Sequence, residues 1–572
     1  MNTNTFYIFL IFVFSVLLSG CGQKNATEYD AANRPHLEKR GQVTQLIVNS
    51  KPWLVLGCEL GNSSSSNREY MQQHWDSLAA SGVNTVLAVV SWEQTEPEEG
   101  KYDFTVVDNL IADARAHNLK IAMLWFGSWK NGITSYTPTW VKKDTKRFPL
   151  AMTPEGKPLP ILTTLGEETC KADAKAFAAV MKHIKEIDAV EQTVVMVQME
   201  NEVGLHGHPR DYCQLANKAF GENVPKQLTD YLKKQQANLL PETMTAWSAN
   251  GCKTEGTWEE VFGSNDRAAE IFMAWNYASY MDKITAAGKE EYDIPVFVNA
   301  WIVQPEDTRP GNYPSGGPQA QNHDIWRAAA PHIDILSPDI YLNNFPEILT
   351  MYARNNNPVF IPESRSGQNG AANAAYAIGQ FGAIGYSPFG FERNCRSNDN
   401  VTFCELYKQM GAAADIILEA QADNRIGAAW LKGSEPMIVK GEIDLGDVRI
   451  MCELVSSGMR NGGAPQLTGG TYNPDDKGYV VAIKEEVGFL ILGSNARVTF
   501  LPKDGKGIVG LSKVTEGEFD EKGVWKEGRW LNGDEIQLRY DLLYAVEEGY
   551  SGQGLNFQTP HPKFLKVELF RY

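Results

Sequence analysis

The chain has 572 residues, 43% of them hydrophobic, and it carries a formal net charge of −17 with a sequence pI near 5.1. This composition excludes a disordered chain and indicates more than one domain, since single hydrophobic cores stop growing near ~250–300 residues. The negative charge also excludes nucleic acid as an expected partner, because a polyanion would be repelled by most of the surface.

The first segment is typical of a lipoprotein signal peptide. Its apolar run, Phe6 to Leu18, is shorter than the ~20 residues of a membrane-spanning helix. "LSGC", ending at Cys21, resembles the bacterial lipobox, which implies cleavage before Cys21 and lipid on its sulfur. We therefore expect residues 1–20 to be a signal, 21–45 a linker, and the protein to be held in the cell envelope, on the outer membrane, by lipid alone. The alternative is an ordinary secretory signal with a chance cysteine.

Eight short, almost continuously apolar runs follow, as expected for parallel strands buried on both faces. They are "PWLVLGCEL" from Pro52, "NTVLAVVSW" from Asn84, "KIAMLWFG" from Lys120, "VVMVQMEN" from Val194, "PVFVNAW" from Pro295, "IDILSPDIY" from Ile333, "PVFIPES" from Pro358 and "AIGYSPFGF" from Ala383. Helical patterns lie between them, beginning at Arg68, Lys171 and Ala269. This succession predicts a (β/α)₈ TIM barrel over residues 46–427. An open doubly wound sheet is the rival, but "GCELGNSSSSN" lacks its Gly-rich phosphate turn.

From about Ala428 the chain is rich in β-branched residues and Gly turns, as in "GYVVAIKEEVGFLILG" and "FLKVELFRY". This pattern predicts a smaller strand-rich, β-sandwich-like domain over residues 428–572.

The cysteines beyond Cys21 number seven and are scattered without CxxC spacing, so they indicate no metal site, and we expect no cofactor. Cys395 and Cys404 are close enough in sequence for a disulfide in an oxidising compartment.

Polar residues at the ends of the predicted strands are the first candidates for chemistry, because the active site of this fold lies at the C-terminal ends of its strands. They are Trp92 after the second run, Glu200, Asn201 and Glu202 after the fourth, Asn299 and Trp301 after the fifth, Asp339 and Tyr341 after the sixth, and Glu363 after the seventh. A pair of carboxylates among aromatic residues is what glycoside hydrolysis requires. Spacing alone does not choose between Glu200 and Glu202. Any one of the strand-end glutamates, Glu363 included, could instead cap a helix or pair with a nearby arginine such as Arg365.

Several motifs resemble the β-galactosidases of glycoside hydrolase family 35, in clan A. "VQMENEVG" is similar to the signature around the catalytic acid, and Ser81 to Phe104 resembles the second βα unit of families 35 and 42. The likeness extends through "PGNYPSGGP", "SPDIY", "NPVFIPES", "GAIGYSPFGFE" and, near the C-terminus, "GRWLNGDE". Two positions differ from the family pattern: Val203 replaces the usual aromatic, and "WFGSWKNG" lacks an acidic residue often found in strand three.

The resemblance implies roles for individual residues. Glu202 would be the acid/base, Glu363 the nucleophile and Asn201 the ligand of the sugar 2-hydroxyl. Tyr341 would hydrogen-bond the nucleophile and keep it anionic, with a packed barrel tyrosine as the alternative. Candidates for lining the sugar pocket are Trp92, Trp129, Asn299 and Trp301, and core packing is the alternative for each.

The sequence thus predicts a lipid-anchored, retaining exo-β-galactosidase with a carbohydrate substrate and no metal. We expect a low pKa for Glu363 and a raised pKa for Glu202. Two alternatives stay open: a clan A β-glycosidase or endo-glycanase of other specificity, and a non-catalytic glycan-binding lipoprotein.

Overall fold

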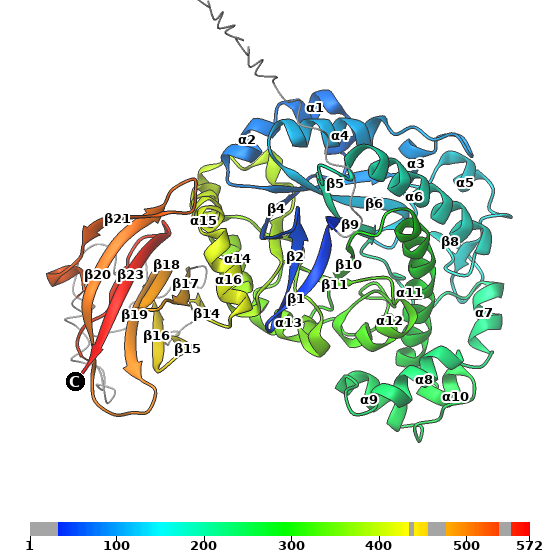
Figure 1. Cartoon of the computed structure of the whole chain (residues 1–572). Coiled ribbons are helices and arrows are strands. Elements are labelled where there is room, and N and C mark those ends of the chain that lie inside the picture. The colour runs from blue at the N-terminus through cyan, green and yellow to red at the C-terminus, as the bar shows by residue number, and fades with distance from the viewer. Residues whose placement is uncertain (1–32, 434–439, 456–475, 537–550) are drawn as a thin grey trace, which may run out of the picture.

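The computed structural model describes residues 33–433, 440–455, 476–536 and 551–572. Its first part is a closed barrel of eight parallel strands, as predicted, and the second is a strand-rich domain beside it (Figure 1). All eight apolar runs form barrel strands: β4 (Val55–Glu59), β5 (Thr85–Ser91), β6 (Lys120–Lys130), β9 (Val194–Asn201), β10 (Val296–Trp301), β11 (Ile335–Ile340), β12 (Ile361–Ser364) and β13 (Gly385–Pro388). The polar residues singled out at the run ends therefore meet at one end of the barrel.

A three-stranded antiparallel sheet precedes the barrel: β1 (His36–Arg40), β2 (Val43–Val48) and β3 (Lys51–Trp53). Leu46 and Val48 of β2 belong to the same buried cluster as the inward side chains of the barrel strands. Because β3 leads almost directly into β4, this sheet closes the N-terminal end of the barrel. Residues 36–40 and 43–45, which we expected in a linker, therefore lie in β1 and β2. The expected signal peptide and Cys21 lie outside the described residues.

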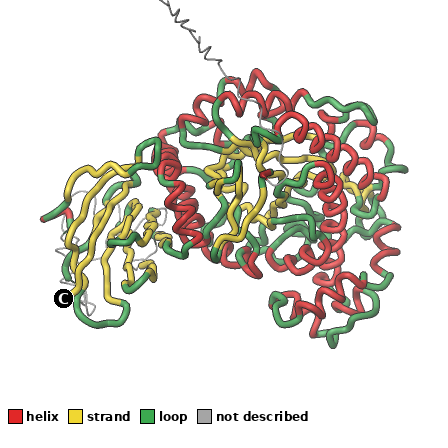
Figure 2. The backbone as a smooth tube through the Cα atoms, viewed as in Figure 1, coloured by secondary structure: helices red, strands yellow, loops and turns green. Residues whose placement is uncertain are grey.

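Helices surround the barrel strands on the outside (Figure 2). The pattern that begins at Arg68 divides into α1 (Arg68–Gln72) and α2 (Trp75–Ala80). The two longest helices are α6 (Glu167–Asp188) and α11 (Asp266–Glu291), which pack closely because Gly288 has no side chain to meet Phe177. The others are α3 (Trp92–Thr95), α4 (Thr105–Ala116), α5 (Thr139–Lys143), α7 (Gln214–Phe220), α8 (Lys226–Gln235), α9 (Pro241–Ser248), α10 (Trp258–Phe262), α12 (His323–Ala329), α13 (Phe345–Tyr352), α14 (Gly367–Phe381), α15 (Val401–Ala412) and α16 (Ala414–Ala422). Within the described ranges, none has the length and apolar character to cross a membrane.

The C-terminal domain consists of two antiparallel sheets with a hydrophobic core of their own. The larger sheet has the order β14 (Ile426–Lys432), β17 (Lys477–Lys484), β18 (Phe489–Ser494), β23 (Lys563–Arg571), β20 (Val509–Phe519), β21 (Trp525–Trp530). The smaller has β15 (Lys440–Leu445), β16 (Val448–Leu454), β19 (Ala496–Pro502), β22 (Leu555–Phe557). The larger sheet packs on α14, where the indole of Trp430 donates to Asn373 at 3.0 Å. This contact joins the two domains.

Candidate active site

Three carboxyl groups meet at the C-terminal end of the barrel. Glu202 follows β9, Asp339 lies near the end of β11 and Glu363 lies in β12; one oxygen of each is within 4.8 Å of the others. All three side chains are buried, although Glu202 and Glu363 keep 7% and 8% of their surface exposed. Two of these carboxyls are the pair chosen from the sequence, and Asp339 adds a third.

Glu200 and Glu202, which the spacing left equivalent, have different environments. The Glu200 carboxylate accepts hydrogen bonds from the backbone N–H groups of Gly127, Ser128 and Trp129, at 3.2, 2.9 and 2.8 Å. Glu200 therefore fixes the end of β6 and does not join the carboxyl cluster, whereas Glu202 does.

The backbone at these two glutamates is left-handed, with φ of 57° at Glu200 and 45° at Glu202. Such φ values are uncommon for residues other than glycine and cost on the order of 1–3 kcal/mol each. Asn299 of β10 supports the strained turn: its Oδ1 accepts from the Glu202 N–H at 3.0 Å and its Nδ2 donates to Asp339 at 2.7 Å. Asn299, expected to line the pocket, thus positions two of the three carboxyls.

Glu363 has one oxygen engaged and the other without a partner among the described residues. The hydroxyl of Tyr341 donates to its Oε1 at 2.6 Å, the contact that the resemblance implied, and Oε2 has no hydrogen bond. Burial raises the pKa of Glu363 above its usual value, while the Tyr341 hydrogen bond and the Lys130 charge act in the opposite direction. The expected low pKa is therefore wrong for this structure, because burial outweighs the groups that favour the charge.

The pKa of Glu202 is raised, as expected. Burial, followed by the negative charge of Glu363, raises its pKa to about 7, against the opposing effects of Lys130 and Asp339. Burial and the neighbouring carboxylates also raise the pKa of Asp339 well above its usual value. Burial and the neighbouring carboxylates therefore favour the protonated form of both Glu202 and Asp339.

Lys130, at the end of β6, supplies positive charge to the carboxyl cluster. Its ammonium group donates to Oδ1 of Asn201 at 2.7 Å and lowers the pKa of both Glu202 and Glu363. Asn201 is fully buried and its Nδ2 has no partner within the described part of the chain. This leaves one amide donor of Asn201 uncommitted beside the carboxyls.

A fourth carboxyl, Glu59, was missed by the sequence analysis. It ends β4, is 0% exposed, and neither oxygen has a hydrogen-bond partner in the described ranges. Burial and the charge of Glu363 raise its pKa well above the usual value. The rule that selected the other residues, a polar side chain at the end of an apolar run, also applies to "GCEL" and could have found it.

The tryptophans separate into two groups. Trp92 is fully buried, donates to Glu96 at 2.8 Å and meets Trp140 edge to face. Trp129 is also buried, donates to the Leu162 carbonyl and packs on Tyr277 and Tyr280. Both belong to the core outside the barrel strands, so neither lines a sugar pocket; Trp301, by contrast, is 37% exposed at the end of β10.

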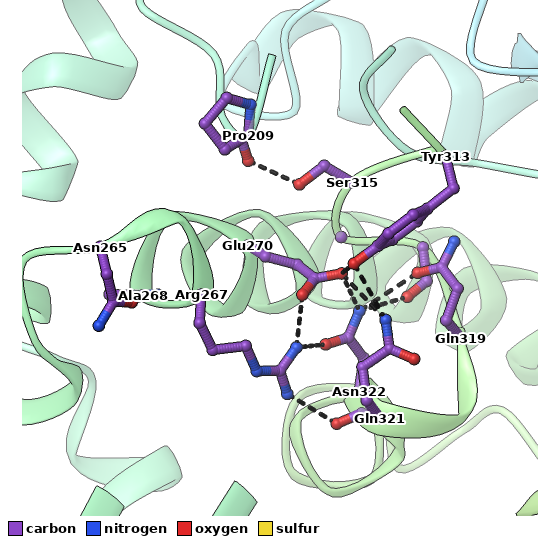
Figure 3. Close-up of polar contacts among 12 residues, drawn as sticks. Pro209, Asn265, Arg267, Ala268, Glu270, Tyr313, Ser315, Gln319, Gln321 and Asn322 are labelled. Atoms are coloured by element: carbon purple, nitrogen blue, oxygen red, sulfur yellow. Dashed lines mark hydrogen bonds and ion pairs between the residues drawn. The ribbon is translucent and has the colours of Figure 1, made fainter. Parts of the chain in front are cut away.

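A polar network on α11 anchors the loop that follows β10 (Figure 3). Buried Glu270 accepts from the Tyr313 hydroxyl at 2.8 Å and from Arg267 at 2.6 Å, and Arg267 also donates to Asn322. The anchored loop pairs through Ser315 with Leu205, three residues after Glu202.

Gly204 allows the close approach between the turn after Glu202 and the loop that contains Ser315. It has φ of 139°, and a Cβ there would lie 2.5 Å from Pro314. The network thus holds the turn that carries Glu202.

Cys395 and Cys404 are both free thiols in this structure, and the Cys404 thiol contacts the Cys395 carbonyl, so the disulfide that their spacing allowed is not formed. Within the described residues, the cluster of Glu202, Asp339 and Glu363 is the group whose spacing could hold a metal ion. The positive charge of the Lys130 ammonium group already acts on this cluster, since it lowers the pKa of Glu202 and Glu363.

Two segments of the chain match known family models. Residues 62–270 match the model Glyco_hydro_42, described as beta-galactosidase, and residues 403–542 match a domain of unknown function, DUF5597. The first match supports a likeness to clan A β-galactosidases, and it does not support the assignment to family 35.

A curated relative shows the same likeness at low identity. Beta-galactosidase LacZ of Heyndrickxia coagulans is 23% identical over 243 residues, which cover 40% of this chain and 34% of that protein. The chain therefore matches about a third of that relative's length.

Among solved structures, the β-galactosidase from Marinomonas ef1 has a TM-score of 0.43 at 12% identity, covering 65% of this chain and 61% of that one. The β-galactosidase from Bacillus circulans sp. alkalophilus has a TM-score of 0.42 at 16% identity, covering 64% and 57%. By its own fold and by the first family match, this chain is a TIM barrel with a glycoside hydrolase family 42-like segment, followed by a strand-rich domain.

Proposed function

We propose that this protein is a retaining β-galactosidase that hydrolyses terminal β-galactosyl residues of oligo- or polysaccharides by double displacement. The observation that carries the proposal is the short distance between the oxygens of Glu202 and Glu363, no more than 4.8 Å. Carboxyls in retaining glycosidases lie ~5–5.5 Å apart, and inverting enzymes need ~6.5–9.5 Å to fit a water. The family 42 match of residues 62–270 supports β-galactoside as the substrate class.

In the first step Glu363 attacks the anomeric carbon. Its Oε2 is the attacking atom, because Tyr341 occupies Oε1 and Oε2 has no hydrogen bond. Glu202 gives its proton to the glycosidic oxygen as the bond to the leaving sugar breaks. The product is a glycosyl ester of Glu363 and a free leaving group.

In the second step Glu202, now ionised, takes a proton from water, which attacks the same carbon and releases Glu363 as a carboxylate. Two inversions give net retention. The Glu202 pKa of about 7 suits both steps, because this group must be an acid in one and a base in the other. Asn201, whose Nδ2 is uncommitted, is the candidate donor to a sugar hydroxyl.

Direct observation of the first sugar released from an aryl β-galactoside tests the mechanism. NMR should show the β-anomer before mutarotation. The α-anomer as first product would mean inversion and would refute the double displacement.

The two alternatives make different predictions. An endo-glycanase would cleave internal linkages of a galactan and leave aryl galactosides intact, and a non-catalytic binder would turn over neither. The raised pKa of Glu202 beside a second carboxyl favours a working acid/base pair over a binding site alone.

We also propose that lipid on Cys21 anchors the protein in the cell envelope, on the outer membrane. The motif "LSGC" supports this. A Cys21→Ser variant should then move from the membrane to the soluble fraction after cell lysis. A variant that remained with the membranes would exclude Cys21 as the anchor.

A further inference from the structure

Two aromatic side chains meet just beyond the turn that carries Glu202. The ring centroids of His206 and Trp301 lie 5.4 Å apart, and the ring planes are at 70° to each other. His206 follows Glu202 by four residues, and Trp301 is the last residue of β10. Because 37% of the Trp301 surface is exposed, this His206–Trp301 pair offers an accessible aromatic surface.

The backbone places Trp301 at the border of the carboxyl cluster. The side chain of Asn299, two positions earlier in β10, bonds both Glu202 and Asp339 and therefore points into the barrel. Alternate residues of a strand share a face, so Trp301 lies on the same face as Asn299, nearer the end of the strand. The register partner of Trp301 in β11 is Asp339, a member of the cluster.

His206 lies on a segment that the fold holds in place. The N–H of Gly207 donates to the Gly311 carbonyl at 2.7 Å, which fixes the backbone directly after His206. A Cβ at Gly132 would lie 2.7 Å from Cδ2 of His206, so the turn after β6 packs directly against the imidazole. The position of the ring is therefore set by close backbone contacts.

Trp301 is held through the loop that follows β10. The side-chain amide of Gln319 donates to the Trp301 carbonyl at 3.3 Å. The same loop pairs through Ser315 with Leu205, the residue before His206. Both aromatic residues are thus tied to one loop, and the surface that they form is a built feature.

The chemistry of the pair suits an uncharged sugar. The exposed indole offers a flat apolar surface, against which the C–H groups of a sugar ring can pack. Burial lowers the pKa of His206, so its ring is uncharged at neutral pH. A neutral imidazole has one donor and one acceptor nitrogen for hydroxyl groups, and no hydrogen bond to another described residue occupies them. Aromatic surface with a few polar groups is typical of ligand sites.

The side of the cluster on which the pair lies indicates which sugar it contacts. Glu202 protonates the glycosidic oxygen in the proposed mechanism, so the leaving group lies next to Glu202. His206 belongs to the turn that carries Glu202, and β10, which ends at Trp301, pairs directly with β9. Glu363 lies in β12, two strands beyond β10. The pair is therefore on the side of the leaving group.

We propose that His206 and Trp301 form the subsite for the leaving sugar, the residue to which the terminal galactosyl group is attached. The inference rests on the proposed β-galactosidase activity. The leaving sugar stacks on the indole of Trp301 and exchanges hydrogen bonds with the imidazole of His206. The pair thereby favours saccharide leaving groups over groups that do not reach it.

Two kinds of donor test the subsite. One is β-galactosyl fluoride, whose leaving group contains no sugar, and the other is a set of disaccharides: lactose and the β-1,3-, β-1,4- and β-1,6-galactobioses. An aryl galactoside is unsuitable as the reference, because its ring would also reach Trp301. The wild-type enzyme should release fluoride and cleave at least one disaccharide.

The quantity to compare is kcat/KM for that disaccharide divided by kcat/KM for the fluoride. Trp301→Ala should lower this ratio about three- to tenfold, as expected for the loss of an aromatic contact. Trp301→Phe should lower it less, because an aromatic face remains. His206→Ala should also lower the ratio, through the loss of hydrogen bonds to the leaving sugar.

Trp530→Ala, at an exposed tryptophan of the C-terminal domain, is the matched control and should leave the ratio unchanged. An unchanged ratio in Trp301→Ala would refute the subsite, because a contact with the galactosyl residue itself would affect both donors equally. A wild-type enzyme that releases fluoride but cleaves none of the disaccharides would refute it as well. Failure of the proposed function would look different, because the wild-type enzyme would then release no fluoride at all.

Discussion

The two halves of the barrel interior differ in chemistry although the same strands build both. In the half next to β2 the inward side chains are apolar, among them Val55, Leu87, Phe297 and Phe360, and they form one buried cluster. Toward the other end, inward positions on these strands become polar and lack hydrogen-bond partners: Glu59, Gln198, Ser337, Asp339, Glu363 and Ser387 each keep at least one such atom among the described residues. A buried polar atom that neither water nor a substrate reaches costs ~1–3 kcal/mol, so any such atom in the second half is kept at the expense of stability.

The apolar half therefore contributes mainly to stability, and the polar half holds the carboxyl cluster proposed to carry out the reaction. A substrate or water can supply hydrogen-bond partners to the polar side chains. The side chains of the apolar half pack against one another and need no ligand. Substitutions in the two halves should therefore have separable effects on activity and on unfolding.

The largest effect is expected for Glu363→Ala. Loss of the attacking carboxylate should reduce kcat for an aryl β-galactoside by ~10⁴-fold or more, with little change in the urea midpoint, because the substitution also removes a buried carboxyl. Added azide should restore turnover and yield the α-galactosyl azide. Retention of more than about a tenth of wild-type kcat would contradict the nucleophile assignment.

Glu202→Ala should be the next most harmful. General acid–base assistance contributes ~10²–10⁴-fold, and azide should here give the β-galactosyl azide. In the wild type, Glu202 must be protonated for the first step, so kcat/KM should fall as pH rises through about 7. The variant should lose that alkaline limb, and a pH profile with the limb intact would assign it to another group.

These two residues also show how far the sequence could predict the site. The eight strands followed from uninterrupted apolar runs, and the pairing of Glu202 with Glu363 followed from their strand ends and from the family resemblance. Spacing alone could not separate Glu200 from Glu202. The family resemblance chose Glu202, but the role of Glu200 was visible only in three dimensions, because it depends on backbone N–H groups some 70 positions earlier.

Other features were beyond the sequence for similar reasons. Trp92 and Trp129 lie next to strand ends but turn outward into the core. At Trp129 the register of β6 with β9 shifts, and such a shift cannot be read from spacing. The balance that raises the pKa of Glu363 depends on burial, which the sequence does not give. The segment 36–45 is short and polar, so its sequence did not indicate strands. The pairing of β1 with β2 is visible only in the structure.

Stability effects should be largest in the apolar half. Leu87→Ala should lower the free energy of unfolding by ~2–5 kcal/mol, because it removes a fully buried side chain from the cluster. Its kcat/KM at a temperature where it is folded should stay near wild type. Ser337→Ala is the counterpart in the polar half and should be neutral or stabilising, since it removes an unpaired hydroxyl. Urea titrations measure both, and equal losses in the two variants would contradict the contrast between the halves.

A smaller, pH-dependent effect is expected for Glu59→Gln. The folded-state pKa of Glu59 is raised, so its favourable contribution is present below the unfolded pKa of ~4.3 and is lost as pH rises through the folded value. The variant should therefore gain stability relative to wild type as pH increases from 4 toward 8. Thermal unfolding at several pH values measures this, and a constant difference in Tm would show that Glu59 does not titrate abnormally.

Covalent trapping tests the central claim most directly. An aryl 2-deoxy-2-fluoro-β-galactoside should inactivate the wild-type enzyme and leave one fluorogalactosyl group, which peptide mass spectrometry should locate on Glu363. Inactivation should be absent in Glu363→Ala and should persist, more slowly, in Glu202→Ala. A label on Glu59, Glu202 or Asp339, or turnover of the parent galactoside with no trapped enzyme, would contradict the proposed roles of the two carboxyls.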